Sequence, residues 1–242
     1  MKSSRFICVV PVLLWTVEGL IREYIHTQLS MNWMDAQNYC ANVYRGLAVV
    51  TSKEEYQRLR EVAGSDGSGW IGMYRSMRNS SVWLWSDGKE YSYFLWMTGQ
   101  PNNINKIQDC VLSNPSGWND YYCWDILPFY CYRFIILVEE KKTWELALDY
   151  CRTHYKDMAS PVSESQLQLA EQEAVQNQMD RVWTGMRFLD GNWYWVNGKQ
   201  LDSTVSMPPC PASPYRCGAR NVKTHVWENR QCSEQLPFLC FG

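Results

Sequence analysis

Cysteine is the residue type with the clearest chemistry in this sequence of 242 residues, which contains ten of them. Cys8 belongs to the N-terminal segment, and nine remain further along: Cys40, Cys110, Cys123, Cys131, Cys151, Cys210, Cys217, Cys232 and Cys240. Cysteines at this density in an exported chain predict disulfide bonds. A structural zinc site would need closely spaced Cys and His ligands, and the chain has three His and no Cys-x-x-Cys pair. Because nine is odd, at least one thiol has no partner within the chain.

The first nineteen residues predict export from the cell. Lys2 and Arg5 make the start positive, residues 6–17 are mostly apolar, and Gly19 is a small residue at the expected cleavage position. The alternative is an uncleaved membrane anchor, but about 12 apolar residues fall short of the ~20 that span a bilayer. No later stretch is long and apolar enough to do so. We therefore expect a signal peptide at 1–19 and a secreted, extracellular protein without a membrane anchor.

Charge and composition argue against several classes of function. The formal net charge is −2, so we expect no electrostatic attraction to nucleic acid or to anionic lipid. His26, His154 and His225 are scattered, and no Ser or Cys nucleophile pattern lies near them. We therefore expect no catalytic residues and predict that the protein is not an enzyme.

An internal repeat with a period of about 110 residues organises the rest of the chain. Trp33 and Cys40 recur as Trp144 and Cys151. Further matches are Trp70–Met73 with Trp183–Met186, Trp83 and Trp85 with Trp193 and Trp195, and Cys123 and Cys131 with Cys232 and Cys240. We expect two copies of one domain, residues 20–133 and 134–242, which abut near Arg133 without a Gly/Ser or Pro-rich linker.

The order of elements is the same in each copy. Short strands are predicted at 24–29 and 133–139, each followed by a helix with one apolar face. Capping boxes at 52–55 and 163–166 start a second helix in each copy. Short antiparallel strands and a long irregular loop follow, which together with the helices predict an α+β fold. The apolar helix faces are Trp33, Ala36, Gln37 and Cys40, and Trp144, Ala147, Leu148 and Cys151.

These features resemble the C-type lectin family over essentially the whole chain after residue 19, twice. The markers are the helix cysteine, the Trp-Ile-Gly-Met strand, the Trp-x-Trp strand before a Gly turn, and the terminal Pro-Phe-x-Cys. Similar tandem pairs occur in fish lectins and in receptors of the macrophage mannose receptor type. Spacing alone leaves the disulfide pairing open. The resemblance implies the pairs Cys40 with Cys131, Cys110 with Cys123, Cys151 with Cys240, and Cys217 with Cys232.

Cys210 is then the cysteine left over. Three expectations stay open for it: a buried thiol, an alternative partner for Cys232, or the link of a disulfide-bonded dimer. A separate modification is expected at Asn79, because Asn79-Ser80-Ser81 is a glycosylation sequon in an exported chain.

The resemblance also implies where a sugar would bind. Sugar-binding members of the family hold Ca²⁺ with a loop tripeptide Glu-Pro-Asn or Gln-Pro-Asp, a second loop Glu, and Trp-Asn-Asp on a strand. Ca²⁺ takes six to eight oxygen ligands, several of them carboxylates, and sugar hydroxyls complete the shell. The ligand-binding residues carried over to the first copy are Gln100, Asn102, Gln108, Asn119 and Asp120, with Asn102, Asn119 and Asp120 as its metal ligands.

The first copy departs from the family in charge. Both loop Glu positions are Gln, at Gln100 and Gln108, so Asp120 is the one carboxylate among the carried-over ligands. Asp109 lies beside the loop, but its family counterpart faces a neighbouring ion position, where Asn103 also replaces an expected acid. Because Ca²⁺ affinity follows the number of charged ligands, we expect weak or partial Ca²⁺ binding at most.

The second copy lacks the tripeptide altogether. A Pro-rich segment, residues 207–211, precedes Cys217, and Trp227-Glu228-Asn229 replaces Trp-Asn-Asp. We expect no Ca²⁺ in this copy and interpret its Pro-rich loop as a protein-contact surface or a rigid spacer.

Two functions from different classes follow. The first is a secreted carbohydrate-binding protein with glycans or glycoproteins as partners, in which the first domain binds with weak or partial Ca²⁺ dependence. The alternative is a protein-binding module that uses the same loops without Ca²⁺. Loss of binding in a chelator would separate them.

Overall fold

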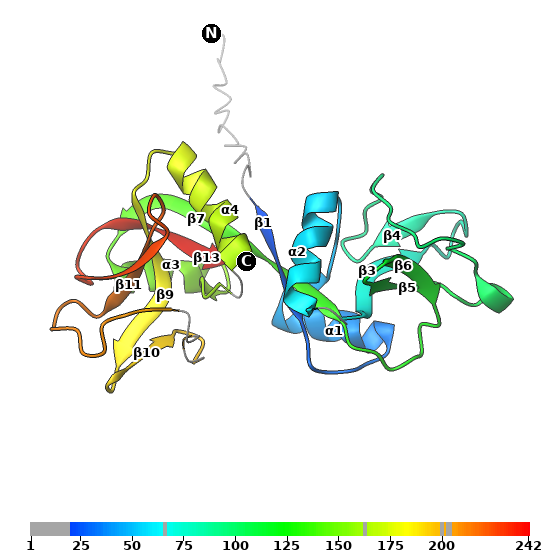
Figure 1. Ribbon diagram of the computed structural model, residues 1–242, viewed down its shortest axis with the longest axis horizontal. Coiled ribbons are helices and arrows are strands. Elements are labelled where there is room, and N and C mark those ends of the chain that lie inside the picture. Colours follow the sequence, from blue (N-terminus) through cyan, green and yellow to red (C-terminus); the bar gives the residue numbers. More distant parts are fainter. Residues whose placement is uncertain (1–19, 65–66, 162–163, 199–200, 202–204) are drawn as a thin grey trace, which may run out of the picture.

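The computed structural model describes residues 20–64, 67–161, 164–198, 201 and 205–242. The predicted signal peptide, residues 1–19, lies outside this range, as does Ser163 of the second predicted capping box. Two α+β domains lie side by side in Figure 1, and strand β1 lies between them. None of the described helices is long and apolar enough to cross a lipid bilayer.

The first domain follows the predicted order of helices, strands and loop. Its two helices come before most of its strands, and the long loop between β4 and β5 contains one short 3₁₀ helix. The elements are β1 (Ile21–His26), α1 (Trp33–Val43), β2 (Gly46–Leu47), α2 (Lys53–Ala63), β3 (Gly69–Arg75), β4 (Trp83–Trp85), η1 (Ile104–Lys106), β5 (Cys110–Asn114), β6 (Gly117–Tyr121) and β7 (Tyr130–Lys142).

The second domain repeats this order after β7. Its elements are α3 (Trp144–His154), β8 (Asp157–Met158), α4 (Glu164–Gln176), β9 (Arg181–Leu189), β10 (Asn192–Trp195), β11 (Cys217–Asn221), β12 (Val226–Arg230) and β13 (Leu236–Phe241). The α+β class predicted from the sequence is confirmed.

Local sequence explains how the helices begin. Asn32 caps α1, because its side chain accepts a hydrogen bond from the N–H of Asp35 at 2.9 Å. Ser52 caps α2 in the same way through the N–H of Glu55, at 3.2 Å. The carboxylate of Glu55, however, accepts from the N–H of Thr51 rather than that of Ser52. The predicted capping box therefore forms in a variant that reaches one residue further back.

Apolar positions at helical spacing place one cysteine of each long disulfide in a core. Trp33, Ala36 and Cys40 are the buried residues of α1, and Trp144, Ala147 and Cys151 those of α3. The described cysteines form four disulfides. The two long bridges join cysteines 91 and 89 residues apart, and on the loop-entropy model each contributes ~4–5 kcal/mol to stability. The pairs are Cys40–Cys131, Cys110–Cys123, Cys151–Cys240 and Cys217–Cys232.

Strand β7 is longer than the strand predicted at 133–139 because it belongs to both domains. Its first half pairs with β1, from Ile21 opposite Ile135 to His26 opposite Tyr130. Its second half pairs with β13 up to Lys142. Backbone hydrogen bonds on either side of residue 133 thus keep the chain extended through the point where the copies meet.

The two domains also share side-chain contacts around β1. Both α2 and α4 pack on this strand, so that it lies between a helix of each domain (Figure 1). Tyr24 lies in a core of the first domain, whereas Ile21 packs against a core of the second. Glu23 is fully buried and pairs with Arg133, whose guanidinium also donates to the carbonyl of Ser160 at 3.2 Å. The interface therefore contains both apolar and ionic contacts.

Candidate functional site

The long loop of the first domain is fastened to β6 by the side chain of Asp120. This side chain is fully buried. One carboxylate oxygen accepts a hydrogen bond from the N–H of Asn102 at 3.0 Å, and the other accepts from the N–H of Asn103 at 2.8 Å. Oε1 of Gln100 also accepts from the N–H of Asn102, at 3.1 Å. Asp120 and Gln100, two of the expected ligand residues, thus hold the loop backbone at Asn102, which is a third.

Gln108 holds the other end of the loop. It is buried, its Oε1 accepts from the N–H of Ile104 at 2.7 Å, and its own N–H donates to Oδ1 of Asn103 at 3.1 Å. Asn103, Asn105 and Lys106 have φ angles of 42°, 57° and 60°. This left-handed region is uncommon for residues other than glycine. The bonds of Gln108 compensate for holding the backbone in this conformation.

Asn119 differs from Asp120 and Gln108 because its side-chain oxygen accepts no hydrogen bond from the described residues. It lies on β6 next to Asp120 and is partly buried. Its Oδ1 is shielded from solvent and has no hydrogen-bond partner among the described residues. A buried acceptor in this state is costly and is normally satisfied by a donor.

Arg75, at the end of β3, is the site residue that sequence reasoning missed. Its Nε lies 3.0 Å from Oδ1 of Asp109, and its Nη2 lies 3.2 Å from Oδ2 of Asp120. The guanidinium also donates to the carbonyl oxygens of Ser80 at 2.9 Å and Gln108 at 3.2 Å. The available signal was a basic residue two positions after the repeated Trp-Ile-Gly-Met segment.

Aromatic side chains enclose this cation from the strand side. The ring centroid of Trp83 lies 4.2 Å from the guanidinium carbon of Arg75, within the range of a cation–π contact. Trp96 packs on Trp83 with a centroid distance of 5.0 Å and against the core residue Trp118 at 6.2 Å. Trp96 is therefore partly core and partly a wall beside the loop.

These residues do not fit a Ca²⁺ ion as they are arranged. Ca²⁺ needs six to eight converging oxygen atoms. The carboxylate of Asp120 is instead surrounded by donors, which are the two backbone N–H groups and the guanidinium of Arg75. Oε1 of Gln108 is likewise taken by a backbone N–H. Among the expected metal ligands, Asn119 retains a buried oxygen without a partner in the described part of the chain.

A cleft of about 1020 Å³ opens beside Arg75 on the side facing α1. Its wall is largely apolar and includes the Cys110–Cys123 disulfide, while Lys106 and Asp109 bring charge to its rim. Further lining residues are Trp33, Met34, Tyr74 and Met77.

The second domain has other side chains at the equivalent positions. The N–H of Arg75 donates to the carbonyl of Asp109 at 2.8 Å, and the N–H of Phe188 donates to that of Arg216 at 2.9 Å. Phe188 therefore matches Arg75, and Arg216 matches Asp109. The guanidinium of Arg216 lies 5.9 Å from the Phe188 ring centroid. Asn229 matches Asp120 and donates from Nδ2 to the carbonyl of Tyr215 at 3.4 Å.

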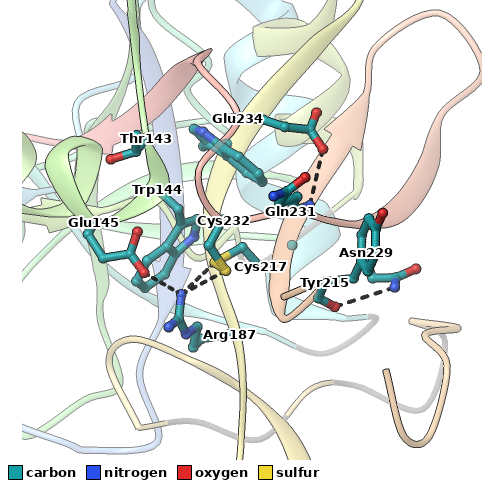
Figure 2. The surroundings of a disulfide bond; sticks show 12 residues. Thr143, Trp144, Glu145, Arg187, Tyr215, Cys217, Asn229, Gln231, Cys232 and Glu234 are labelled. Carbon is teal, nitrogen blue, oxygen red and sulfur yellow. Dashed lines mark hydrogen bonds and ion pairs between the residues drawn. A yellow bond between two sulfur atoms is a disulfide. The ribbon is translucent and has the colours of Figure 1, made fainter. Parts of the chain in front are cut away.

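Figure 2 shows how a neighbouring arginine is held in the second domain. Nη1 of Arg187 lies 2.9 Å from Oε1 of Glu145 and 3.0 Å from Sγ of Cys232. Its guanidinium stacks over the ring of Trp144, 4.8 Å from the centroid. Glu145, Cys217 and Cys232 form a tight cluster, but both cysteines are joined in a disulfide. With no thiolate and a cation in its midst, this cluster is unsuited to a metal ion.

Glu228 occupies the position of Asn119 but is turned to other partners. Its carboxylate lies 2.7 Å from Nε of Arg181 and accepts from Nδ2 of Asn221 at 2.9 Å. Burial works to raise the pKa of Glu228, but the hydrogen bonds from Arg181 and Asn221 outweigh it and lower the pKa below its usual value. This carboxylate is committed to a local ion pair.

Two further predicted residues lie at the surface. Asn79 is exposed, as a glycosylation acceptor must be. Cys210 is exposed and free. The expectations of a buried thiol and of a Cys210–Cys232 pair are therefore wrong, because the Pro-rich segment leaves Cys210 outside the core and Cys217 takes Cys232.

The fold and these disulfides define a lectin-like class of domain, and a comparison with family models identifies it. The Lectin C-type domain model matches residues 29–133 and again residues 140–241. The chain therefore belongs to the C-type lectin domain family and contains two tandem copies of the domain.

Relatives of known name include two fish proteins. Ladderlectin of Oncorhynchus mykiss is 34% identical over 108 residues, which are 43% of this chain and 55% of ladderlectin. Lactose-binding lectin l-2 of Anguilla japonica is 35% identical over 123 residues, covering 48% of this chain and 74% of that protein. This chain thus spans little more than half of the length of ladderlectin. Among solved structures, the mouse scavenger receptor C-type lectin carbohydrate-recognition domain matches with a TM-score of 0.44 and 29% identity, over 47% of this chain and 90% of that one.

Proposed function

We propose that this protein is a secreted carbohydrate-binding protein whose first domain recognises glycans with at most weak dependence on Ca²⁺. The observation that carries the proposal is the braced loop of residues 100–108 beside the buried, unpartnered Oδ1 of Asn119. This oxygen is shielded from solvent as arranged, so a sugar hydroxyl would donate to it once the Asn119 side chain turns toward the loop surface, which would satisfy the oxygen. The relative named as a lactose-binding lectin supports a sugar as the ligand.

Glycan-array binding by the whole secreted chain, in Ca²⁺ and in EDTA, tests this proposal. We expect glycan binding that EDTA weakens less than about tenfold. Asn119→Ala should lower the affinity at least about fivefold, which corresponds to one hydrogen bond of about 1 kcal/mol. Glu228→Ala, at the matching position of the second domain, is the control and should leave glycan affinity unchanged. Equal binding by the Asn119 variant and the unmodified chain would contradict the role of the first domain.

A second candidate function is a Ca²⁺-independent protein-binding module. It is favoured by the ion pair between Arg75 and Asp120, which removes the carboxylate on which an ion would depend. It is also favoured by the largely apolar wall of the 1020 Å³ cleft. This function predicts a protein partner whose binding survives both chelation and enzymatic removal of its glycans, whereas a glycan-binding protein would lose a deglycosylated partner.

The predicted processing belongs to the same proposal. Secretion requires removal of residues 1–19, so the mature protein should start at Leu20 and comprise domains at 20–133 and 134–242. The sequon predicts that an N-glycosidase lowers the mass of the secreted chain by one glycan at Asn79. N-terminal sequencing and intact-mass measurement check both, and a mature protein that starts at Met1 would contradict secretion by this route.

A further inference from the structure

The oxygen atoms around Arg75 resemble the shell of a bound cation. The guanidinium has four oxygen partners, which are the carboxylates of Asp109 and Asp120 and the carbonyls of Ser80 and Gln108. Carboxylates and backbone carbonyls are also the ligands that a hard cation such as Ca²⁺ takes. The side chain of Arg75 is only 12% exposed, so it is committed to this position.

We propose that Arg75 is a built-in cation of the first domain, which supplies the positive charge that Ca²⁺ supplies in sugar-binding relatives and makes the loop order independent of the ion. The guanidinium takes one oxygen of Asp120, and the same carboxylate carries the N–H groups of Asn102 and Asn103. Through Asp120 and the carbonyl of Gln108, Arg75 thus reaches both ends of the loop. This inference concerns the loop and its ion, and it holds whether or not the domain binds glycans.

Charge balance explains why the two glutamines accompany this arginine. A dication matches a shell with several carboxylates, whereas a guanidinium carries one positive charge. With Glu at positions 100 and 108, Arg75 would face a larger excess of negative charge. With Gln100 and Gln108, two carboxylates face Arg75, Asp109 on the exposed side and Asp120 on the buried side. The amide of Gln108 still provides the oxygen that the N–H of Ile104 needs.

The second domain shows the converse. Phe188 replaces the cation, and Asn229 replaces the carboxylate that the cation would neutralise. The guanidinium of Arg216 lies over the Phe188 ring. The first domain therefore has both the arginine and the buried carboxylate at these matching positions, and the second domain has neither.

Thermal unfolding of the whole chain with and without about 5 mM Ca²⁺, several-fold above the dissociation constants of extracellular Ca²⁺ modules, tests the proposal. For the unmodified chain we expect the same Tm in Ca²⁺ and in EDTA. Arg75→Gln should lower the Tm of the first unfolding transition by on the order of 5 °C. Arg78→Gln, an exposed arginine on the neighbouring turn, is the control and should leave the Tm unchanged.

Arg75→Asp replaces the cation with a third carboxylate, next to Asp109 and Asp120. This variant should unfold at a lower temperature in EDTA and regain several degrees in Ca²⁺. Adding Gln100→Glu and Gln108→Glu should strengthen Ca²⁺ binding in the Arg75→Gln background and leave it undetectable when Arg75 is present.

Calorimetric Ca²⁺ titration of the unmodified chain keeps the proposal falsifiable if the Arg75 variants do not fold. Absence of a binding signal up to about 5 mM is expected. Saturable binding in that range, or a Tm that Arg75→Gln leaves unchanged, would overturn the proposal. Failure to bind any glycan on an array would count against the proposed function and would leave the Tm and Ca²⁺ results as they are.

Discussion

The two domains share one backbone hydrogen bond between strand and loop at the candidate site, but the side chains there have opposite chemistry. In the first domain a cation on β3, Arg75, pairs with a loop acid, Asp109. In the second domain an aromatic ring on β9, Phe188, is covered by a loop arginine, Arg216. The backbone hydrogen bond that joins strand to loop is unchanged, at 2.8 and 2.9 Å. The fold thus provides a place for a charge near the loop without requiring one.

Charge is not lost from the second domain but lies elsewhere. Arg220 and Glu171 are 2% and 1% exposed and pair between β11 and α4. At the position of Arg220 the first domain has Ser113, since each is paired across the sheet with the matching tryptophan. One buried ion pair therefore lies at the candidate binding loop of the first domain, and another lies beneath a helix of the second domain. We expect the first to affect binding and the second to affect stability alone.

The largest effect should come from breaking the buried pair of the second domain. Arg220→Ala would leave the buried carboxylate of Glu171 with His225 but without its guanidinium partner, and we expect a loss of about 3–5 kcal/mol in the free energy of unfolding. Denaturant unfolding followed by tryptophan fluorescence measures this loss. Glycan affinity should not change at a temperature where the variant is folded. A loss of affinity at that temperature would show that the ion pair of the second domain affects binding as well as stability.

A smaller effect is expected at the binding loop. Asp120→Asn keeps the shape but removes the charge that Arg75 and the two loop N–H groups contact, so we expect a loss of about 1.5–3 kcal/mol. The reciprocal change in the second domain, Asn229→Asp, should alter stability by less than about 0.5 kcal/mol. Equal losses in the two variants, measured by the same unfolding titration, would show that the two loops depend on this position alike.

A still smaller difference, in the pH dependence of the free energy of unfolding, is expected between the positions of Glu228 and Asn119. The folded-state pKa of Glu228 is lowered, so its ion pair stabilises the second domain above the unfolded-state value of 4.5. That contribution is lost as the pH falls through the folded-state pKa. Glu228→Gln should therefore reduce the stability difference between pH 6 and pH 3, by up to about 1 kcal/mol because the carboxylate is partly exposed. Asn119 does not titrate, and Asn119→Asp is the matched variant that should add a new acid dependence to the first domain.

The smallest effect on stability is expected at Cys210. This thiol is exposed and unpaired, so Cys210→Ser should change the free energy of unfolding by less than about 0.5 kcal/mol. The same variant tests whether two chains are joined through it. If they are, non-reducing electrophoresis of the secreted protein should give a dimer that Cys210→Ser abolishes. A monomer before and after the change would show that Cys210 does not join two chains.

The fold could be predicted from the sequence because it rests on local and repeated signals. Helical spacing of Trp33, Ala36 and Cys40 gives the buried face of α1, and the same pattern recurs in α3. The turn before Gly88 needs a positive φ, which is 79° here and 80° at the matching Gly198. The extent of β7 was not predicted, because it depends on pairing with β1 and β13, which are far away in the sequence.

The candidate site could be predicted only in part. The loop and β6 residues were found because a motif marks them, but a motif does not say what else contacts Asp120. Arg75 lies 45 residues away in the sequence, and on its own it is an ordinary charge at the end of a strand. Whether it points to solvent or into the loop depends on Trp83 and Asp109, which the fold brings to it.

The shared strand has a consequence for dissecting the molecule. A cut after residue 133 would remove Phe134 and Ile135, which pair with Arg22 and Ile21. It would also strip Ile21 of the apolar neighbours that it has in the second domain. Both fragments would then carry a bare strand edge, which is a template for aggregation. We therefore expect single-domain fragments to aggregate more readily than the tandem pair, which keeps this sheet intact.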